Sequence, residues 1–155
     1  MPEFRLIDVA ERPYLYVERT CSMAPEEISA AMGDAFQQVY GFMQTHGIEA
    51  VNGALSVYYT YQPDSMTFRA GFFISGEDTK KAGAPVFADS TPAGKVVTFT
   101  HMGPYERLRE SYAELMQYLE REGLKPGTPT WEVYLNGPDE TPEEELRTEV
   151  FVSLA

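Results

Sequence analysis

The stretch 130–135 alternates residues that favour buried surroundings with residues that carry polar groups. Successive side chains of a β-strand point to opposite faces, so this pattern predicts a strand with Trp131 and Val133 on one face. Glu132 and Tyr134 then share the other face. If the first pair packs into the core, Glu132 is either a solvated acid on an open surface or a carboxylate at the bottom of an aromatic pocket. The rest of the chain favours the pocket.

Similar patterns predict the remaining elements of the chain. Strands are predicted at residues 4–10, 14–20, 55–61, 67–75, 94–101, 131–135 and 146–154. Apolar residues recur at helical spacing in the ranges 28–43 and 108–119, which predicts two helices. Gly47 and Gly123 follow these ranges, and a glycine just past a helix readily adopts the left-handed conformation that ends it.

A loop-like stretch at 76–93 separates two similar halves of the chain. It holds two glycines and two prolines, and we interpret it as a connector with a short strand at 86–87. A long connector of this kind is either functional or a passive linker.

The two halves match each other at a constant offset of 76 residues. The matches cover the helix stripe, the glycine that ends the helix and the strand that follows: Met32 with Leu108, Phe36 with Tyr112, Val39 with Leu115, Met43 with Leu119, Gly47 with Gly123, Val57 with Val133 and Tyr58 with Tyr134. Such agreement in one register indicates an internal duplication. Each half reads strand–helix–strand–strand and buries little by itself, so the two halves must share a core.

The predicted fold is therefore α+β and consists of a single domain, 1–155. Its parts are repeat 1 (1–75), the connector (76–93) and repeat 2 (94–155). We expect two antiparallel sheets and two main helices related by a pseudo-twofold axis, with a central groove where the repeats meet. Junctions of this kind are common small-molecule sites.

The duplication assigns candidate residues to this groove. Glu132 corresponds to Ser56 and Tyr134 to Tyr58, so all four are expected to line it. Glu132 has no acidic counterpart, which suggests a role beyond folding. We also place Tyr112 and Trp131 among the ligand-binding candidates, although the position of Trp131 on the opposite strand face favours a core residue. Tyr105 is placed within reach of the groove from the start of the second helix.

Alternative roles stay open for several of these residues. Glu132 can form a structural ion pair with Arg69 or Arg147, and the tyrosines can serve only as cross-strand packing. His101 precedes the second helix and is interpreted as a capping or packing residue. Desolvation raises the pKa of a carboxyl group in an apolar cleft, and such a group can bind a cation or transfer protons.

Composition excludes several function classes. The chain has 155 residues and a formal net charge of −12, with 12 basic residues among 24 acidic ones, and this balance provides no basic footprint for nucleic acid. A single cysteine fits a reducing compartment. Neither an apolar leader nor a membrane-spanning run is seen, so we predict a cytoplasmic protein. No phosphate-binding loop, zinc spacing or triad order is present, and we predict no cofactor and no metal.

Several segments together resemble the gyrase-inhibitor-like (GyrI-like) effector-binding domain family. They are 101–105, the second helix with Gly123 and Leu124, 131–136 with Pro138, and 146–150. The resemblance spans essentially the whole chain. It implies a tandem strand–helix–strand–strand fold with a ligand groove, in which the acid at the position of Glu132 meets the positive charge of a lipophilic ligand and aromatic residues stack on its rings. The chain contains no helix-turn-helix pattern, so the resemblance implies the free-standing form.

The resemblance leaves three functions to distinguish. The first is a binding protein that senses or sequesters lipophilic, cationic drugs or toxins. The second is a hydrolase of strained cyclopropane-bearing toxins, in which Glu132 and Tyr134 are the catalytic candidates. The third, implied by the family name, is a protein that binds a topoisomerase. A protein partner and the oligomeric state are left open by the sequence.

Overall fold

The computed structural model describes residues 3–51, 53–61, 64–104, 107–135 and 141–154. The described residues form eight strands and two main helices, α1 (Pro25–His46) and α2 (Leu108–Glu122). The strands are β1 (Arg5–Val9), β2 (Arg12–Ser22), β3 (Ala54–Tyr61), β4 (Ser65–Phe73), β5 (Phe87–Thr91), β6 (Gly94–Met102), β7 (Pro126–Tyr134) and β8 (Arg147–Leu154). Short 3₁₀ helices lie at Gly76–Lys81 (η1) and Glu143–Glu145 (η3). The predicted α+β class is confirmed.

Both main helices end as their sequence predicts. Gly47 and Gly123 have φ angles of 66° and 69°, and their N–H groups bond back to carbonyls in the last turn of α1 and α2. Pro25 opens α1, and Glu26 and Glu27 lie in its first turn, where carboxylates interact favourably with the partial positive charge of the helix N-terminus.

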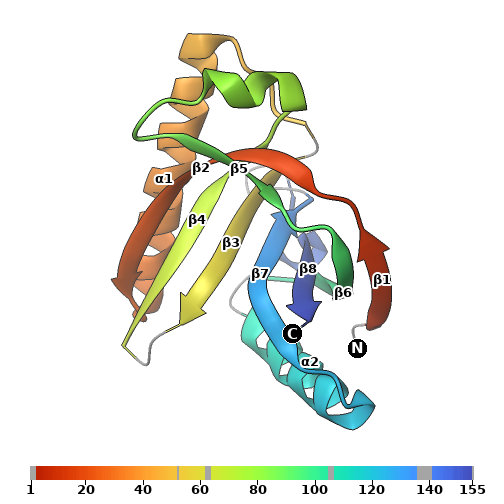
Figure 1. Ribbon diagram of the computed structural model, residues 1–155. Coiled ribbons are helices and arrows are strands. Elements are labelled where there is room, and N and C mark those ends of the chain that lie inside the picture. The colour runs from red at the N-terminus through yellow and green to blue at the C-terminus, as the bar shows by residue number, and fades with distance from the viewer. Residues whose placement is uncertain (1–2, 52, 62–63, 105–106, 136–140, 155) are drawn as a thin grey trace.

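The strands form one antiparallel sheet in the order β1-β6-β8-β7-β3-β4-β2-β5. The chain continues from β1 into β2 and from β5 into β6. Arg5 of β1 pairs with Thr98 of β6, and Arg12 of β2 pairs with Thr91 of β5. Both steps along the chain are seven residues long, so the antiparallel register continues unbroken from one strand pair to the other. This continuous ribbon links the two ends of the sheet and curls it into the half-barrel of Figure 1.

One structural expectation needs correction. The two halves share a single sheet rather than two, because β3 of the first half pairs directly with β7 of the second. The stretch 76–93 carries a strand as expected, but β5 runs from Phe87 to Thr91 rather than over 86–87; it adds to the edge of β2, and η1 precedes it. Pro13 lies inside β2, next to the edge strand β5, which is where a residue without an N–H group is tolerated.

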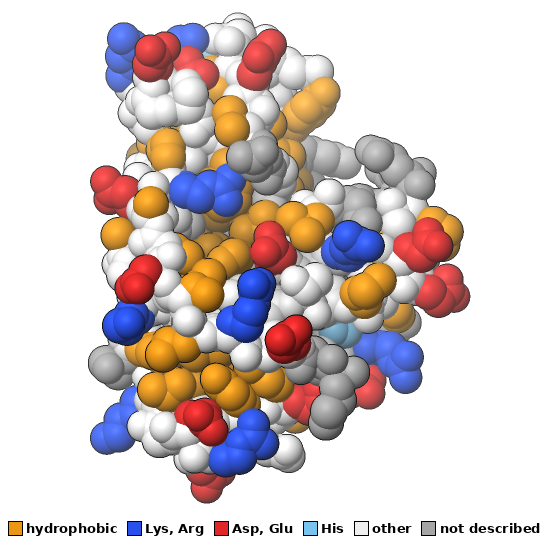
Figure 2. All heavy atoms as spheres, turned by 90° about the vertical axis from the view of Figure 1, so that its right-hand side faces the viewer, with side chains coloured by type: hydrophobic (Ala, Val, Ile, Leu, Met, Phe, Trp, Pro, Cys, Tyr) orange, Lys and Arg blue, Asp and Glu red, His pale blue; other side chains and the backbone are white. Residues whose placement is uncertain are grey.

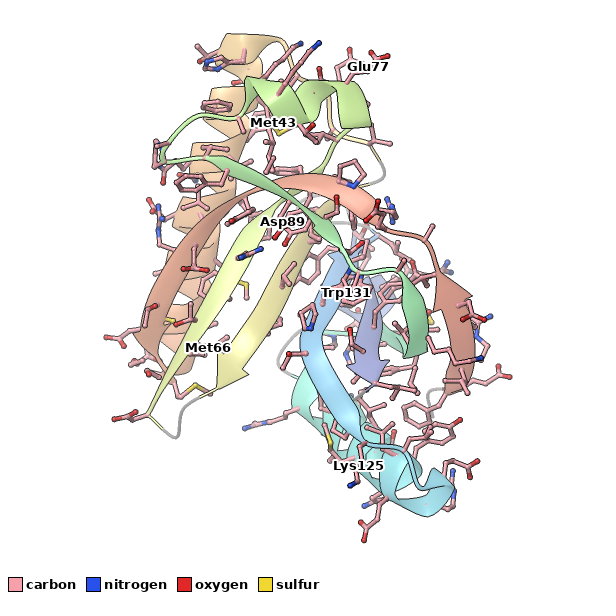
Figure 3. The ribbon with its side chains drawn as sticks, in the orientation of Figure 1. Met43, Met66, Glu77, Asp89, Lys125 and Trp131 are labelled. Atoms are coloured by element: carbon pink, nitrogen blue, oxygen red, sulfur yellow. The ribbon has the colours of Figure 1, made fainter. Side chains whose placement is uncertain are left out.

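Both helices cover the same face of the sheet. Val39 and Met43 of α1 pack with Leu15 and Phe68, while α2 packs on Phe99 and on neighbouring residues of β6 and β8. The opposite face, inside the curl, holds a third cluster of buried residues that includes Tyr14, Leu55, Val57, Phe73, Val96, Trp131 and Val133. Figure 3 shows the labelled Trp131 on β7, away from α2.

Candidate ligand-binding site

The centre of the sheet carries the predicted polar residues on its helix-covered face. Strands β3 and β7 are neighbours there, and Ser56 pairs directly with Glu132. Tyr58 and Tyr134 lie two residues further along their strands and therefore share that face. Three of these residues are buried, since Ser56 is 0% exposed and Glu132 and Tyr58 are each 6% exposed, whereas Tyr134 is half-buried.

Hydroxyl groups surround the Glu132 carboxylate. Tyr112 of α2 donates a 2.6 Å hydrogen bond to Oε2, and Tyr134 donates a 2.8 Å bond to Oε1. Ser56 Oγ lies 2.6 Å from the Tyr134 hydroxyl and donates to the Tyr58 hydroxyl at 3.0 Å. We call these five residues the Glu132 cluster. Four members come from the sheet and only Tyr112 comes from a helix.

Burial dominates the electrostatics of this cluster. It raises the pKa of Glu132 above the ordinary value of 4.5, while hydrogen bonds from Tyr112, Tyr134 and Tyr58 and the charge of His101 act in the opposite direction. Burial, reinforced by the charge of Glu132, also raises the pKa of Tyr134 well above its ordinary value. Tyr134 therefore keeps its proton and acts as a hydrogen-bond donor.

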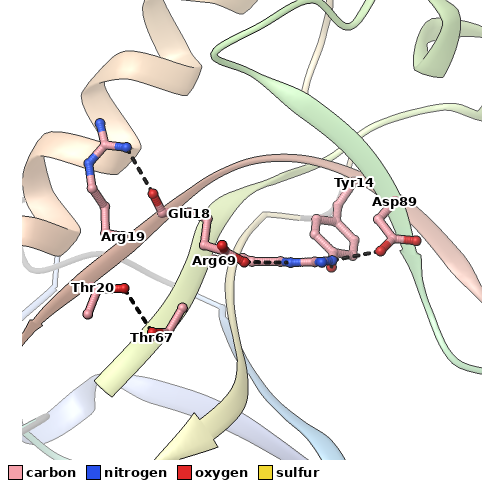
Figure 4. Close-up of polar contacts among 7 residues, drawn as sticks. All are labelled: Tyr14, Glu18, Arg19, Thr20, Thr67, Arg69 and Asp89. Carbon is pink, nitrogen blue, oxygen red and sulfur yellow. Dashed lines mark hydrogen bonds and ion pairs between the residues drawn. The ribbon is translucent and has the colours of Figure 1, made fainter. Parts of the chain in front are cut away.

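No basic side chain forms an ion pair with Glu132 within the described part of the chain. Arg69, one expected partner, lies on β4 beside Val57, which belongs to the opposite face of the sheet. Its Nη1 atom binds Asp89 at 2.6 Å and Tyr14 at 3.1 Å, as Figure 4 shows. The Glu132 carboxylate is thus stabilised by neutral hydroxyl groups rather than by a fixed cation.

Aromatic rings extend from the Glu132 cluster towards α1. The Phe36 ring lies 6.1 Å from that of Tyr134 and 5.8 Å from that of Phe72, both in edge-on arrangements. Tyr40, one turn further along α1, lies 6.2 Å from Phe72 and is 54% exposed. A path of aromatic surface therefore leads from the solvent to the buried carboxylate.

The remaining candidates lie elsewhere. Trp131 points into the cluster inside the curl, where it stacks on Phe151 at 5.3 Å, so it does not share a face with Glu132. Tyr105 lies outside the described residues. His101 of β6 is 5% exposed and packs against α2, where its Nδ1 atom contacts Ser111.

Sequence reasoning missed two features of the site. The first is Phe36, which helical spacing assigns only to the apolar stripe of the first helix. Its match with Tyr112 at the offset of 76 is the signal that could have placed it near the site. Thr148 of β8 pairs with both Tyr134 and His101 and is 0% exposed, yet its hydroxyl has no hydrogen-bond partner among the described residues. No sequence signal marks that threonine. Among the described residues, no group of three or more His, Cys, Asp or Glu residues is arranged to hold a metal ion.

Comparison with known proteins identifies the family. A family model described as the GyrI-like small molecule binding domain matches residues 2–155. The chain belongs to this family. None of the curated proteins matches its sequence. No described helix of this GyrI-like domain is long and apolar enough to cross a membrane.

Solved structures share the fold of this GyrI-like domain. The EcmrR C-terminal domain is 20% identical with a TM-score of 0.78, and the match covers 100% of this chain and 98% of that one. SAV2435 bound to tetraphenylphosphonium is 15% identical with a TM-score of 0.67, covering 99% and 94% of the two chains. A hydrolase from Listeria innocua is 18% identical with a TM-score of 0.66, covering 99% and 92%.

Proposed function

We propose that this GyrI-like domain binds lipophilic cations between α1 and α2, with Glu132 as the opposite charge. The observation that carries the proposal is a carboxylate that is 6% exposed and forms no ion pair with a basic side chain among the described residues. Burying an unpaired charge is costly, and a bound cation would offset that cost. Aromatic faces near the carboxylate add a cation–π attraction of about 1 kcal/mol or more once water is excluded.

Ligand access in this proposal depends on Tyr112. It is the one donor of the Glu132 cluster that is attached to a helix rather than to the sheet. A ligand that enters beside Tyr40 and Phe36 reaches Glu132 once the Tyr112 side chain swings aside. Ser56, Tyr58 and Tyr134 then keep the carboxylate in place from the sheet.

A relative and the surface charge support the same function. SAV2435 was solved with tetraphenylphosphonium, a lipophilic cation. The net charge of −12 favours cationic ligands. On the face shown in Figure 2, basic and acidic side chains are interspersed, and no continuous basic surface for nucleic acid is seen there. We propose a protein that senses or sequesters such compounds.

Equilibrium dialysis with tetraphenylphosphonium tests the proposal. We expect saturable binding with one molecule per chain, and we expect a second lipophilic cation such as a rhodamine dye to displace it. Triphenylphosphine oxide, which has similar rings and no net charge, should compete poorly. Binding of the neutral compound as tightly as the cation would contradict the role of Glu132.

A hydrolase is the second candidate, supported by the fold shared with a Listeria innocua hydrolase and by the raised pKa of Glu132. A carboxylate of this kind suits a general base, and Tyr134, which keeps its proton, suits a donor to a developing negative charge. The test is product formation from cyclopropane-bearing electrophiles. More than one product molecule per chain, reduced about 10²–10⁴-fold in Glu132→Gln, is expected of a hydrolase. Absence of product leaves binding as the function.

The finer symmetry of the fold is part of the proposal. We infer that repeats 1–75 and 94–155 are related by a pseudo-twofold axis at the Ser56–Glu132 pair. At the offset of 76, Leu55 corresponds to Trp131 and Val57 corresponds to Val133. The register supports the symmetry, because each residue pairs with the counterpart of the other: Leu55 pairs with Val133, and Val57 pairs with Trp131. Superposition of the two repeats in an experimental structure tests it: Val57 and Val133 should coincide, and unrelated environments for these two residues would rule the symmetry out.

A further inference from the structure

A second polar cluster lies outside the Glu132 cluster, where the start of α2 meets β6. Ser111 Oγ is 2.7 Å from His101 Nδ1, and His101 Nε2 is 3.1 Å from the carbonyl oxygen of Pro104. Ser111 and His101 are 7% and 5% exposed. The proposed binding of cations uses neither the hydroxyl nor the imidazole ring.

The carbonyl group fixes the tautomer of His101. A carbonyl oxygen only accepts hydrogen bonds, so Nε2 must carry the hydrogen that is donated to Pro104. In the neutral ring Nδ1 is then an acceptor, and the Ser111 hydroxyl donates to it. A hydroxyl bonded to a base that is itself oriented by a third group is the arrangement that activates serine nucleophiles.

A surface depression gives access to this pair. It has a volume of about 590 Å³ and both Ser111 and His101 are among its lining residues. The volume is within the range of small-molecule sites. The lining also holds the guanidinium groups of Arg5 and Arg107, which can stabilise a developing oxyanion. Among the described residues that line the depression, all except Met102 are polar.

We propose that Ser111 is a nucleophile for small hydrophilic esters, with His101 as its general base. Ser111 Oγ forms a bond to the acyl carbon as Nδ1 takes the hydroxyl proton. The bond from the acyl carbon to the alcohol oxygen then breaks, and the imidazolium returns the proton to the leaving alcohol. Water, deprotonated by His101, attacks the acyl–serine ester and releases a carboxylic acid, which restores Ser111.

The polarity of the depression sets this site apart from the cation site. Tyr112, next to Ser111 in α2, donates to Glu132 and packs edge-on against the ring of Phe99, so it belongs to an aromatic surround. The depression instead offers charged groups of both signs, including Arg107 and Glu110, which lie 3.4 Å apart. Its substrates are therefore expected to be polar esters rather than lipophilic cations.

The test is covalent labelling of the intact protein with a fluorophosphonate probe that carries a hydrophilic linker, followed by peptide mass spectrometry. We expect one label per chain, on the peptide that contains Ser111. His101→Gln should slow labelling by about 100-fold or more, because general-base assistance is typically worth about 10²–10⁴-fold. Hydrolysis of p-nitrophenyl acetate should show a burst of nitrophenol that is lost in Ser111→Ala.

Controls separate this activity from folding and from the cation site. Ser153→Ala, which removes another buried hydroxyl, should label at the rate of the parent, and excess tetraphenylphosphonium should not slow labelling. Ser111→Cys keeps a nucleophile in place and should react with iodoacetamide at that position, which shows that the site is formed even if Ser111→Ala unfolds. A parent protein that stays unlabelled, or labelling that is unchanged in His101→Gln, would overturn the proposal.

Discussion

Replacing Glu132 by Gln tests the electrostatic role of the buried carboxylate. The amide has nearly the same shape and can still accept a hydrogen bond from Tyr112 or Tyr134, but it carries no charge. Hydrogen-bonded charged groups contribute about 1.5–3 kcal/mol, and removing one interacting partner costs about 1–3 kcal/mol. The affinity for tetraphenylphosphonium should therefore fall about 5- to 150-fold.

Isothermal titration calorimetry measures this change, and Glu149→Gln is the matched control. Glu149 lies on β8 opposite Val133, so it is on the other face of the sheet, and its replacement changes the net charge by the same amount. That variant should bind the cation within about twofold of the parent if the effect is local, because Glu149 acts from the other face of the sheet and salt screens interactions between distant charges. Triphenylphosphine oxide should bind both variants equally. An equal loss of cation affinity in both variants would refute a specific role for Glu132.

The remaining predictions concern pH and stability. Because burial raises the pKa of Glu132, cation affinity should rise as pH increases above the ordinary value of 4.5, and binding should release protons, which calorimetry in buffers of different ionisation enthalpy detects. The folded state binds the Glu132 proton more tightly than the unfolded state does. Glu132 therefore lowers the free energy of unfolding of the ligand-free protein as pH rises from about 4.5 through the raised pKa of the folded state. The slope of the unfolding free energy against pH should be less negative in Glu132→Gln. Thr148→Val should stabilise the protein by about 1 kcal/mol in urea denaturation, since it removes a buried hydroxyl without a described partner; a loss above about 1 kcal/mol would show that the hydroxyl is satisfied. Gly71→Ala should destabilise by about 3 kcal/mol or more, because its Cβ would lie 1.7 Å from the Leu15 carbonyl oxygen, whereas Gly33→Ala on the open side of α1 should be neutral or stabilising by about 1 kcal/mol.

Local signals predicted the elements of the fold well. The helical stripes and the glycines at 47 and 123 located both helices, because helix periodicity and helix ends are encoded by residues close together in sequence. The alternation around Glu132 placed it correctly on the face opposite Trp131. The single sheet was not predicted, because the pairing of β3 with β7 joins segments more than 70 residues apart and no local pattern specifies it.

The same limit applies to the candidate site. The offset of 76 alone predicts that Ser56, Tyr58, Glu132 and Tyr134 line one groove. It does not reveal that Tyr112 donates to the carboxylate, because the rotation of α2 over the sheet depends on the packing of its buried apolar side chains. The sequence predicts only a short strand at 86–87 and not the extent or the pairing of β5, because its five residues alternate only weakly in polarity and are defined by their partner β2.

A crystal structure of the protein with bound tetraphenylphosphonium would show directly whether Glu132 binds the cation. We expect the phosphonium between α1 and α2, with its charge facing the Glu132 carboxylate and a phenyl ring against Phe36 or Tyr134. The Tyr112 side chain should have moved from its 2.6 Å contact with Oε2. The cation bound elsewhere, with Tyr112 still donating to Glu132, would contradict this role of Glu132.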